Sequence, residues 1–525
     1  MKTQRQKSYV LTRNSNPEKI ITVLQKRYKV GEIENVSDEE HYFDTFDWRL
    51  YRREMTFYVT RNELTLRRLG GTVISRLKGN NASRYFWWDL EPSSFTEVLR
   101  KSIEMRALLP IVTMNYSVRT FRVMNRDRKT IVRIILRKDT VEEQQHLREL
   151  PGVLIIHEMR GYEKQFQNVI KTLGNIGLLD DTKNLSHLDR ALEASGQKPL
   201  DYGDKFSVVL EQHISIGNAV ATICQNLVGS MEVNHPGVCA DLDSEFLHDF
   251  RIAIRRTRSL LTLLKRVLPA DRTAWFQAEF KWLGSVTGPL RDIDVYLLEK
   301  EKYLSLVPNS LRDGLDVFFD NLIKRRVTEL ELLKKNLNSE RYQNLIDTWT
   351  SFLNDADSDL YKGIRANECR PVVTAIIKKR FKAFLRDADK ISQDSPPEMI
   401  HQLRIKGKKF RYLLEFFKSF YDGNDVDLFL KYMKKLQDNL GEYNDLSVQQ
   451  DMLRATLSQL KSRGAQAMKL AAALGGAITA LAEKQSKVRS RFKKTYGAFR
   501  KEKNINLLTA MVSADKSLGS ERGKR

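Results

Sequence analysis

Two stretches decide the fold of the second half of the chain: HDFRIAIRRTRSLLTLLK, residues 248–265, and HQLRIKGKKFRYLLEFFK, residues 401–418. They align without a gap at an offset of 153 residues, which places Arg251 opposite Arg404. Further identical pairs at this offset are Leu260 and Leu413, Gly288 and Gly441, and Asp292 and Asp445. Self-similarity at a long fixed period indicates repeated structural units, so we expect two copies of one helical unit.

Cations recur along one face of each expected helix. The separations are 3, 4 and 3 residues in both copies, at His248, Arg251, Arg255 and Arg258 and at His401, Arg404, Lys408 and Arg411. At 100° per residue this spacing keeps the side chains within an arc of about 80°. Arg256 and Lys409 flank the two stripes at equivalent positions. Apolar positions follow a different face and predict a core seam of Phe250, Ile254, Thr257, Leu261, Leu264 and Leu268.

A basic helical stripe is often only a solvated surface, in which acidic residues at i±4 relieve the repulsion. Segment 250–268 contains no acidic residue. Neighbouring cations without acids repel one another, so the arrangement costs stability unless an anion is present. Because the same geometry occurs twice in one chain, we favour an anion-binding surface. Each histidine alternatively serves as a capping or core hydrogen-bonding residue, and the pattern leaves both roles open.

The first 180 residues have a different character. Alternating apolar and polar residues predict two short strands within 56–69, around Asn62, and further strands at 72–79, 84–91, 116–124, 130–138 and 153–159. Helical spacing occurs at 95–109 and 161–179. From about residue 205 the strand signal stops, and helical patterns follow one another with short breaks at 268–271, 307–310, 395–398 and 421–425. We therefore predict an α+β domain with an antiparallel sheet, followed by an all-α helical bundle with an internal twofold repeat.

Composition limits the classes of function. The 525 residues are 41% hydrophobic and carry a formal net charge of +23, about +10 of it in residues 1–200. A folded, strongly basic protein suggests a polyanionic partner, namely nucleic acid, acidic lipid or polyphosphate. The three cysteines form no CxxC pair and predict neither a disulfide framework nor a zinc site.

Localisation follows from the same kind of reading. The N-terminus has no apolar signal-peptide core, and the longest uncharged apolar run, 470–481, is shorter than the roughly 20 residues of a membrane span. We expect a cytoplasmic protein without a membrane span.

The paired segments resemble the CHAD domain, the conserved histidine α-helical domain. The resemblance is carried by ExLHDFRIAIRRTRS with WLGSVTGPLRDIDVYL, and by EMIHQLRIKGKKFRYLLEFF with LQDNLGEYNDLSVQQ, and it covers about residues 205–500. It implies a twofold helical bundle that binds inorganic polyphosphate on a basic surface and has no catalytic chemistry of its own. The implied polyphosphate-binding residues are His248, Arg251, Arg255, Arg256, Arg258, His401, Arg404, Lys408, Lys409 and Arg411, with Arg291 as a weaker candidate. Asp292 and Asp294 are expected to orient or pair with these cations.

The first 180 residues resemble a CYTH, or triphosphate tunnel, domain. The resemblance lies in segments 41–71, 74–79 and 157–166, the first of which contains the family's Y-x-D-T pattern at Tyr42 to Thr45. Active members open with a Glu-x-Glu-x-Lys strand whose acids help to hold a divalent metal. This chain has Gln4 and Gln6 at those places, and glutamine cannot supply the charge that Mg²⁺ or Mn²⁺ prefers.

Other charged residues remain on the predicted strands of this domain. The cations are Arg67, Arg68, Arg76, Lys78, Arg119, Arg122, Arg133 and Arg137, and the candidate acids are Glu63, Asp89, Glu91 and Glu158. The cations either attract phosphate oxygens or face solvent. We expect a tunnel-like fold that is degenerate, with no catalytic residues, no bound metal and no cofactor.

The predicted organisation is a CYTH-like domain at 1–180, a linker at 181–204 and a helical domain at 205–505. Within the helical domain, repeat one covers about 205–350 and repeat two about 360–500, and residues 514–525 are expected to form a disordered tail. The expected function is non-enzymatic binding of inorganic polyphosphate, on polyphosphate granules of the cytoplasm. The alternatives are an inorganic triphosphatase that recruits substrate through its helical domain and a nucleic-acid-binding module, for which nonspecific backbone contact is sufficient.

Overall fold

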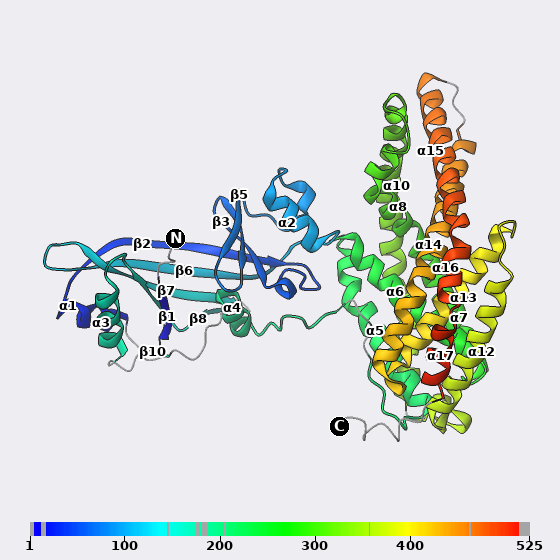
Figure 1. The fold of residues 1–525 in the computed structure, drawn as a ribbon, viewed down its shortest axis with the longest axis horizontal. Helices are drawn as coiled ribbons and strands as arrows, with labels where there is room; N and C mark the ends of the chain where they lie inside the picture. The colour runs from blue at the N-terminus through cyan, green and yellow to red at the C-terminus, as the bar shows by residue number, and fades with distance from the viewer. Residues whose placement is uncertain are drawn as a thin grey trace. The chain divides into compact units, whose positions relative to one another are not determined.

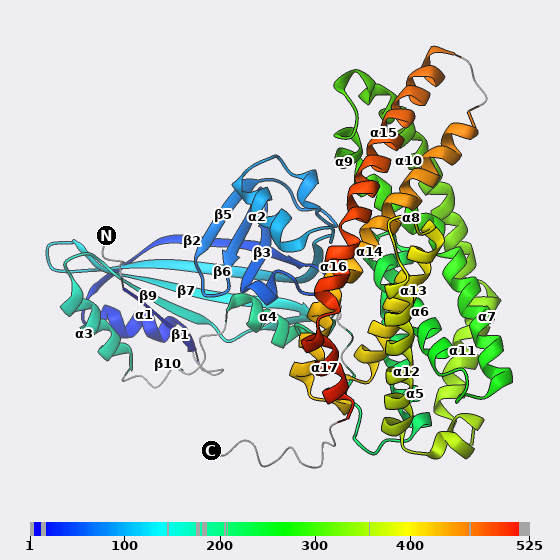
Figure 2. The same ribbon diagram turned by 45° about the vertical axis from the view of Figure 1, so that its right-hand side comes forward.

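The computed structural model describes residues 5–11, 17–143, 146–174, 179–180, 186–203, 206, 208–355, 357–460 and 464–513. The chain divides into two compact units, 1–204 and 205–525 (Figures 1 and 2). The predicted tail at 514–525 lies outside the described residues.

The N-terminal unit is built on an antiparallel sheet, as the sequence predicted. Its strands are β1 (Gln6–Leu11), β2 (Lys29–Asp44), β3 (Met55–Thr60), β4 (Glu63–Arg68), β5 (Val73–Lys78), β6 (Leu109–Met124), β7 (Thr130–Glu143), β8 (His146–Glu149), β9 (Val153–Glu158) and β10 (Leu179–Asp180). Its helices are α1 (Pro17–Gln25), α2 (Ser94–Ile103), α3 (Glu163–Gly174) and α4 (His187–Ser195), with short 3₁₀ turns η1 (Tyr51–Arg53) and η2 (Trp87–Asp89). The described strands pair in the order β10-β1-β9-β7-β6-β2-β3-β4-β5, and β8 pairs with β7.

Alternation along β2 places its side chains in two separate cores. Phe43 packs in a cluster with Phe57 of β3 and Leu99 of α2, whereas the preceding Tyr42 packs in a cluster with Leu192 of α4. Adjacent strand residues point to opposite faces of a sheet, so α2 and α4 cover opposite faces (Figure 1).

A buried carboxylate organises the loop after β2. Asp44 accepts hydrogen bonds from the backbone N–H groups of Thr45 at 2.7 Å, Leu50 at 2.9 Å and Tyr51 at 2.8 Å. Burial raises the pKa of Asp44 to about 7, although these three hydrogen bonds favour its charged form. The aspartate of the Y-x-D-T pattern therefore has a structural role in this chain.

Two predicted elements of this unit, at 84–91 and 95–109, differ from the structure, and one long strand was not predicted. Segment 84–91 is not a strand: Tyr85 makes an isolated bridge to Leu108, and Trp87–Asp89 form η2, stabilised by stacked rings of Phe86 and Trp88. The helix predicted at 95–109 ends at Ile103, and the following residue takes a positive φ of 55°. The long strand β2 was not predicted, because its acidic, exposed first half lacks an apolar alternation.

The linker predicted at 181–204 is also corrected by the structure. Residues 181–185 and 204 lie outside the described residues, but the described part contains the packed helix α4. Leu188, Ala191 and Leu192 of α4 are buried in one of the cores. The glycine and proline residues that suggested a linker lie after this helix. They carry no information about the apolar face of α4, which the prediction therefore missed.

The second unit is helical, as predicted. Its helices are α5 (Ile216–Cys239), α6 (Ser244–Leu263), α7 (Ala270–Val286), α8 (Gly288–Leu298), α9 (Lys300–Leu304), α10 (Arg312–Leu337), α11 (Glu340–Asn354), α12 (Cys369–Asp389), α13 (Pro397–Phe416), α14 (Gly423–Ser458), α15 (Ala465–Ser490), α16 (Phe492–Phe499) and α17 (Glu502–Met511). Short 3₁₀ turns lie between them: η3 (Asn309–Leu311), η4 (Asp359–Tyr361), η5 (Gly363–Ala366) and η6 (Lys418–Phe420).

Helix bounds in the two halves of this unit agree with the 153-residue offset. The helices α5 and α12 begin at 216 and 369, α6 and α13 at 244 and 397, α7 and α14 at 270 and 423, and α10 and α15 at 312 and 465. The halves differ where α7 and α8 are separate helices, because α14 runs through the equivalent position without a break. The twofold repeat itself stays a prediction.

The predicted core seam is confirmed, since all six of its residues are buried. One helix, α15 with its continuation to Phe499, is long and apolar enough to cross a membrane by length and composition among the described residues. Within the unit this helix packs through Leu470, Leu474 and Leu481, and it lies beside α10 in both views (Figures 1 and 2). Gly314 of α10 allows close approach to the Lys469 carbonyl, where a Cβ atom would collide.

Replacement of Asp44 by Ala should destabilise the N-terminal unit by about 3 kcal/mol, because three N–H groups lose their acceptor. Chemical denaturation of the full chain, followed by fluorescence and circular dichroism, measures the change. Asp44→Asn is the matched control and should lose less, since its amide oxygen still accepts. Equal stability of Asp44→Ala and the wild type would contradict this role.

Candidate anion-binding cavity

A cavity of about 1080 Å³ lies in the helical unit. Its lining comes mainly from α6 and α13, which carry the two predicted stripes, and from α8 and α14. The apolar faces of α6 and α13 are buried in the core, and this fixes the orientation of both helices. Their basic faces consequently point toward the cavity. Residues far apart in sequence therefore line one space.

Most of the predicted site residues line this cavity. They are His248, Arg251, Arg255, Arg256, Arg291, Arg404, Lys408 and Arg411. The two stripes thus contribute to one common cavity, a question that the sequence left open.

Three predicted residues are not part of the lining. Arg258 is exposed and lies against Gly284, and His401 is exposed and its Nδ1 lies 2.5 Å from the Asn444 side-chain oxygen. Lys409 lies near Arg380 and Arg258, and burial together with these cations lowers its pKa. A ligand role for these three residues stays a prediction.

The cavity also contains acids that the stripes lack. Its lining has ten basic side chains and six carboxylates, the latter being Asp292, Glu299, Glu415, Asp438, Glu442 and Asp445. Several of these acids neutralise a cation: Asp445 lies 3.2 Å from Arg404, and Glu415 lies 3.3 Å from Arg256 and 2.5 Å from Arg411. The number of cations therefore overstates the positive charge available to a ligand.

Arg251, Arg255 and Lys408 are different, because none of them has a carboxylate within 4.0 Å in the part of the chain that the structure describes. Arg251 donates to the Gly284 carbonyl at 3.0 Å and to the Thr287 hydroxyl at 2.8 Å. Arg255 donates through Nε to the Tyr412 hydroxyl at 2.9 Å. The hydrogen-bond partners that orient these guanidinium groups are therefore neutral, although Asp292 also acts on the charge of Arg251 from beyond ion-pair distance.

Lys408 has the least favourable surroundings of the three. Burial, followed by repulsion from Arg404 and Arg255, lowers its pKa to about 8. Burial lowers the pKa of Arg251 as well. An anion in the cavity would favour the charged form of Lys408 and relieve the repulsion.

The acids of the RDIDV segment do not both act as predicted. Asp294 is buried and binds Arg326 of α10 at 2.7 Å, so it pairs with a cation outside the stripes. Asp292 does line the cavity, and burial raises its pKa against the opposing effect of Arg251. Arg326 was not identified from sequence, because nothing in the local pattern joins residues 294 and 326.

Sequence reasoning also missed three cations of the cavity: Lys302, Arg325 and Lys484. They come from region 300–370, which has as many acidic as basic residues, and from the basic region 484–503, and neither region contains a regular stripe. Their helices, α9, α10 and α15, bring these three side chains to the cavity, and this could not be seen from the sequence.

The predicted cations of the N-terminal unit are mostly bound within that unit. Arg137 is buried between Glu40 at 2.7 Å and Asp139 at 2.6 Å. Arg119 binds Glu32 at 2.9 Å and also pairs with Glu18. Arg76 pairs with Glu63. Arg67 donates to the Gly71 carbonyl, and Arg68 donates to the Arg53 carbonyl. Carboxylates of the same unit therefore neutralise Arg137, Arg119 and Arg76, whereas the partners of Arg67 and Arg68 are neutral.

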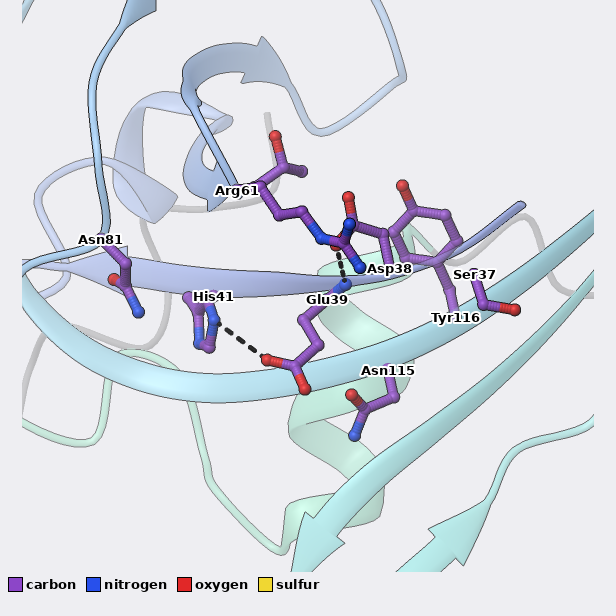
Figure 3. A pocket seen from close by; sticks show the side chains of 9 residues that line it. Ser37, Asp38, Glu39, His41, Arg61, Asn81, Asn115 and Tyr116 are labelled. Atoms are coloured by element: carbon purple, nitrogen blue, oxygen red, sulfur yellow. Dashed lines mark hydrogen bonds and ion pairs between the residues drawn. The ribbon is translucent and has the colours of Figure 1, made fainter.

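A cavity of about 460 Å³ in the same unit is lined by residues of β2, β3 and β6 (Figure 3). Arg61 points toward Asp38 at 3.2 Å, and His41 points toward Glu39 at 3.4 Å. None of the eight predicted strand cations lines it. No group of three His, Cys, Asp or Glu residues suited to a metal ion occurs within the described ranges.

Comparison with known proteins identifies the domain. Residues 222–454 match the family model of the CHAD domain. The chain therefore contains a CHAD domain in its helical unit, as its motifs predicted.

The curated relatives include the uncharacterized protein MT2285 of Mycobacterium tuberculosis (strain CDC 1551 / Oshkosh), 25% identical over 288 residues. The match covers 52% of this chain and 54% of that protein, so the chain spans about half the length of the curated relatives it matches.

Similar solved structures include the CHAD domain from the plant Ricinus communis, 24% identical, with a TM-score of 0.48, covering 56% of this chain and 94% of that one. The N-terminal sheet resembles HpAC1 from Hippeastrum, described as an adenylyl cyclase with a dominant triphosphatase activity. That likeness has 14% identity and a TM-score of 0.26, and covers 38% of this chain and 100% of the other.

Lys408→Met should stabilise the protein without ligand, because it removes a cation whose charged form is disfavoured. The folded-state pKa of about 8 lies below the ordinary 10.5, so the cost is present below pH 8 and declines as pH rises toward 10.5. We expect a gain of about 1 kcal/mol at pH 7 and less at pH 10. Chemical denaturation at both pH values tests this. A loss of stability at pH 7 would contradict the account.

Proposed function

We propose that the helical unit binds inorganic polyphosphate in the cavity between α6 and α13. The observation that carries the proposal is the group of Arg251, Arg255 and Lys408, three cations from two helices that line one cavity and have no carboxylate partner among the described residues. Like charges held together in a partly buried space favour a multivalent anion over a single charge.

The chemistry of these groups suits phosphate. Arginine offers a planar pair of donors to phosphate oxygens, and lysine a more mobile point charge. A linear polyphosphate carries a negative charge on every unit, so successive units can meet cations that recur along both helices. The CHAD match supports this assignment through the family to which the domain belongs.

Nucleic acid fits the cavity less well. The stripes contain two aromatic residues, Phe410 and Tyr412, and both are buried. Phe410 packs on Phe381 and Phe384, and Tyr412 packs near Phe416. Stacking of bases on exposed aromatic rings is a main source of affinity for single strands, so neither ring supports it. The proposed function is binding without catalysis. It includes association of the protein with polyphosphate granules in the cytoplasm.

Reversing two of the three cations tests the site. The double substitution Arg255→Glu with Lys408→Glu should weaken binding of long-chain polyphosphate about 100-fold or more, and reduce the slope of log affinity against log salt by about 2. Isothermal titration calorimetry at two salt concentrations measures both quantities, and circular dichroism checks the fold.

The matched control is Lys378→Glu with Lys379→Glu, which makes the same charge change at exposed positions of α12 outside the cavity lining. It should retain most of the affinity. Similar losses in both double variants would indicate a response to net charge alone. In the same experiment with Mg²⁺, release of free phosphate would favour the triphosphatase alternative, and equal affinity for duplex DNA would favour a generic polyanion surface.

Binding should depend on pH through Lys408. The pKa of Lys408 is about 8 without ligand, and a bound polyanion raises it. At a pH between the pKa of the free protein and that of the complex, binding is therefore accompanied by uptake of a proton. Affinity should be constant below pH 8 and fall by up to about tenfold per pH unit above it. Titrations from pH 7 to 9.5 in wild type and Lys408→Arg measure this. The arginine variant should lose the decline, and an identical decline in both would exclude Lys408 as its source.

A further inference from the structure

Tyr412 of α13 contacts two arginines of α6 at once. Its hydroxyl accepts from Arg255 Nε at 2.9 Å. The guanidinium of Arg256 lies over its ring, 5.8 Å from the centroid. Tyr412 itself is buried, with 8% of its surface exposed, and it belongs to the cavity lining. One rigid side chain therefore holds two flexible cations.

The surroundings of Arg256 restrict it further. Its guanidinium also lies 5.2 Å from the ring centroid of Phe206, and one terminal nitrogen binds Glu415 at 3.3 Å. Two aromatic rings and a carboxylate thus stabilise the positive charge of Arg256. In this position Arg256 covers Tyr412 and limits the movement of its ring.

Arg255 is held differently. Its guanidinium donates one hydrogen bond, through Nε, and its two terminal amino groups have no hydrogen-bond partner within the described ranges. A guanidinium bound through Nε keeps its terminal edge available, and that edge matches two oxygens of a phosphate. The contact with Tyr412 therefore orients the group without using the donors that a phosphate needs.

The other half of the cavity lacks this arrangement. At the 153-residue offset Lys408 corresponds to Arg255, and Ser259 corresponds to Tyr412. The Ser259 hydroxyl donates to the Arg255 carbonyl of its own helix at 2.7 Å. Lys408 has no hydrogen bond or ion pair with any described residue. The two halves are therefore unequal, with an oriented arginine facing an unrestrained lysine.

We infer that Tyr412 is a positioning residue that fixes Arg255 for bidentate contact with a phosphate unit of the bound polyanion. The inference rests on the proposed function and assigns the orienting role to one half of the cavity. Pre-organisation of a donor removes the ordering cost from binding, so loss of the Tyr412 hydroxyl should reduce affinity without removing any charge.

The test is a double-mutant cycle in the full chain with long-chain polyphosphate as the probe. Tyr412→Phe and Arg255→Lys should each weaken binding about tenfold, and the double variant should be little weaker than either single one, because the hydroxyl acts through Arg255. The slope of log affinity against log salt should stay as in the wild type, since all three variants keep the cationic charge.

Tyr421→Phe is the matched control. It removes a tyrosine hydroxyl that pairs with Thr374 at 2.8 Å in the same unit, outside the cavity lining. It should leave affinity unchanged. Thermal unfolding of each variant separates loss of orientation from loss of fold.

Wild-type affinity in Tyr412→Phe, or fully additive losses in the double variant, would overturn this inference and leave the proposed function standing. Failure of the wild type to bind polyphosphate would overturn the proposed function and this inference with it. A lowered affinity in Tyr412→Phe that is matched by Tyr421→Phe would equally overturn the assignment.

Discussion

Partial burial of the cations Arg251 and Lys408 beside Arg255 is the constraint on which the cavity of the helical unit depends. These three cations line one cavity, and none of them has a carboxylate within 4.0 Å among the described residues. Burial, followed by repulsion from Arg404 and Arg255, lowers the pKa of Lys408, which costs stability at neutral pH. Apolar burial offsets this cost, because the same helices place Phe250, Leu261 and their neighbours in the core. An anion from outside the protein would lower this cost further, because it would favour the charged form of Lys408.

The sequence predicts this part of the molecule well because the relevant information is local. A helix repeats every 3.6 residues, so the order of residues 248–268 separates the basic face from the core face before any tertiary contact is known. The contacts that modulate the charge are not local. Asp445 meets Arg404, and Tyr412 meets Arg255, across distances in sequence that no periodicity spans.

The N-terminal unit shows the reverse situation. Its strand cations left phosphate binding and solvent exposure as alternatives, but Arg137 lies between Glu40 and Asp139, and Arg119 lies beside Glu32. Charge counted along a strand does not distinguish a ligand site from an internal ion pair, because the partner comes from a neighbouring strand. The acidic strand β2, which supplies two of these partners, was also the strand that the apolar pattern failed to predict.

The interruption between α7 and α8 has a consequence for symmetry. At this interruption the Gly284 carbonyl and the Thr287 hydroxyl accept hydrogen bonds from Arg251. The equivalent Arg404 instead pairs with Asp445 of the uninterrupted α14. The cavity walls are thus chemically distinct. A linear chain of identical phosphates reads the same from both ends, so reversing it inside such a cavity produces the same complex. A strand with a 5′ and a 3′ end would meet two different walls, and this cavity would discriminate its polarity.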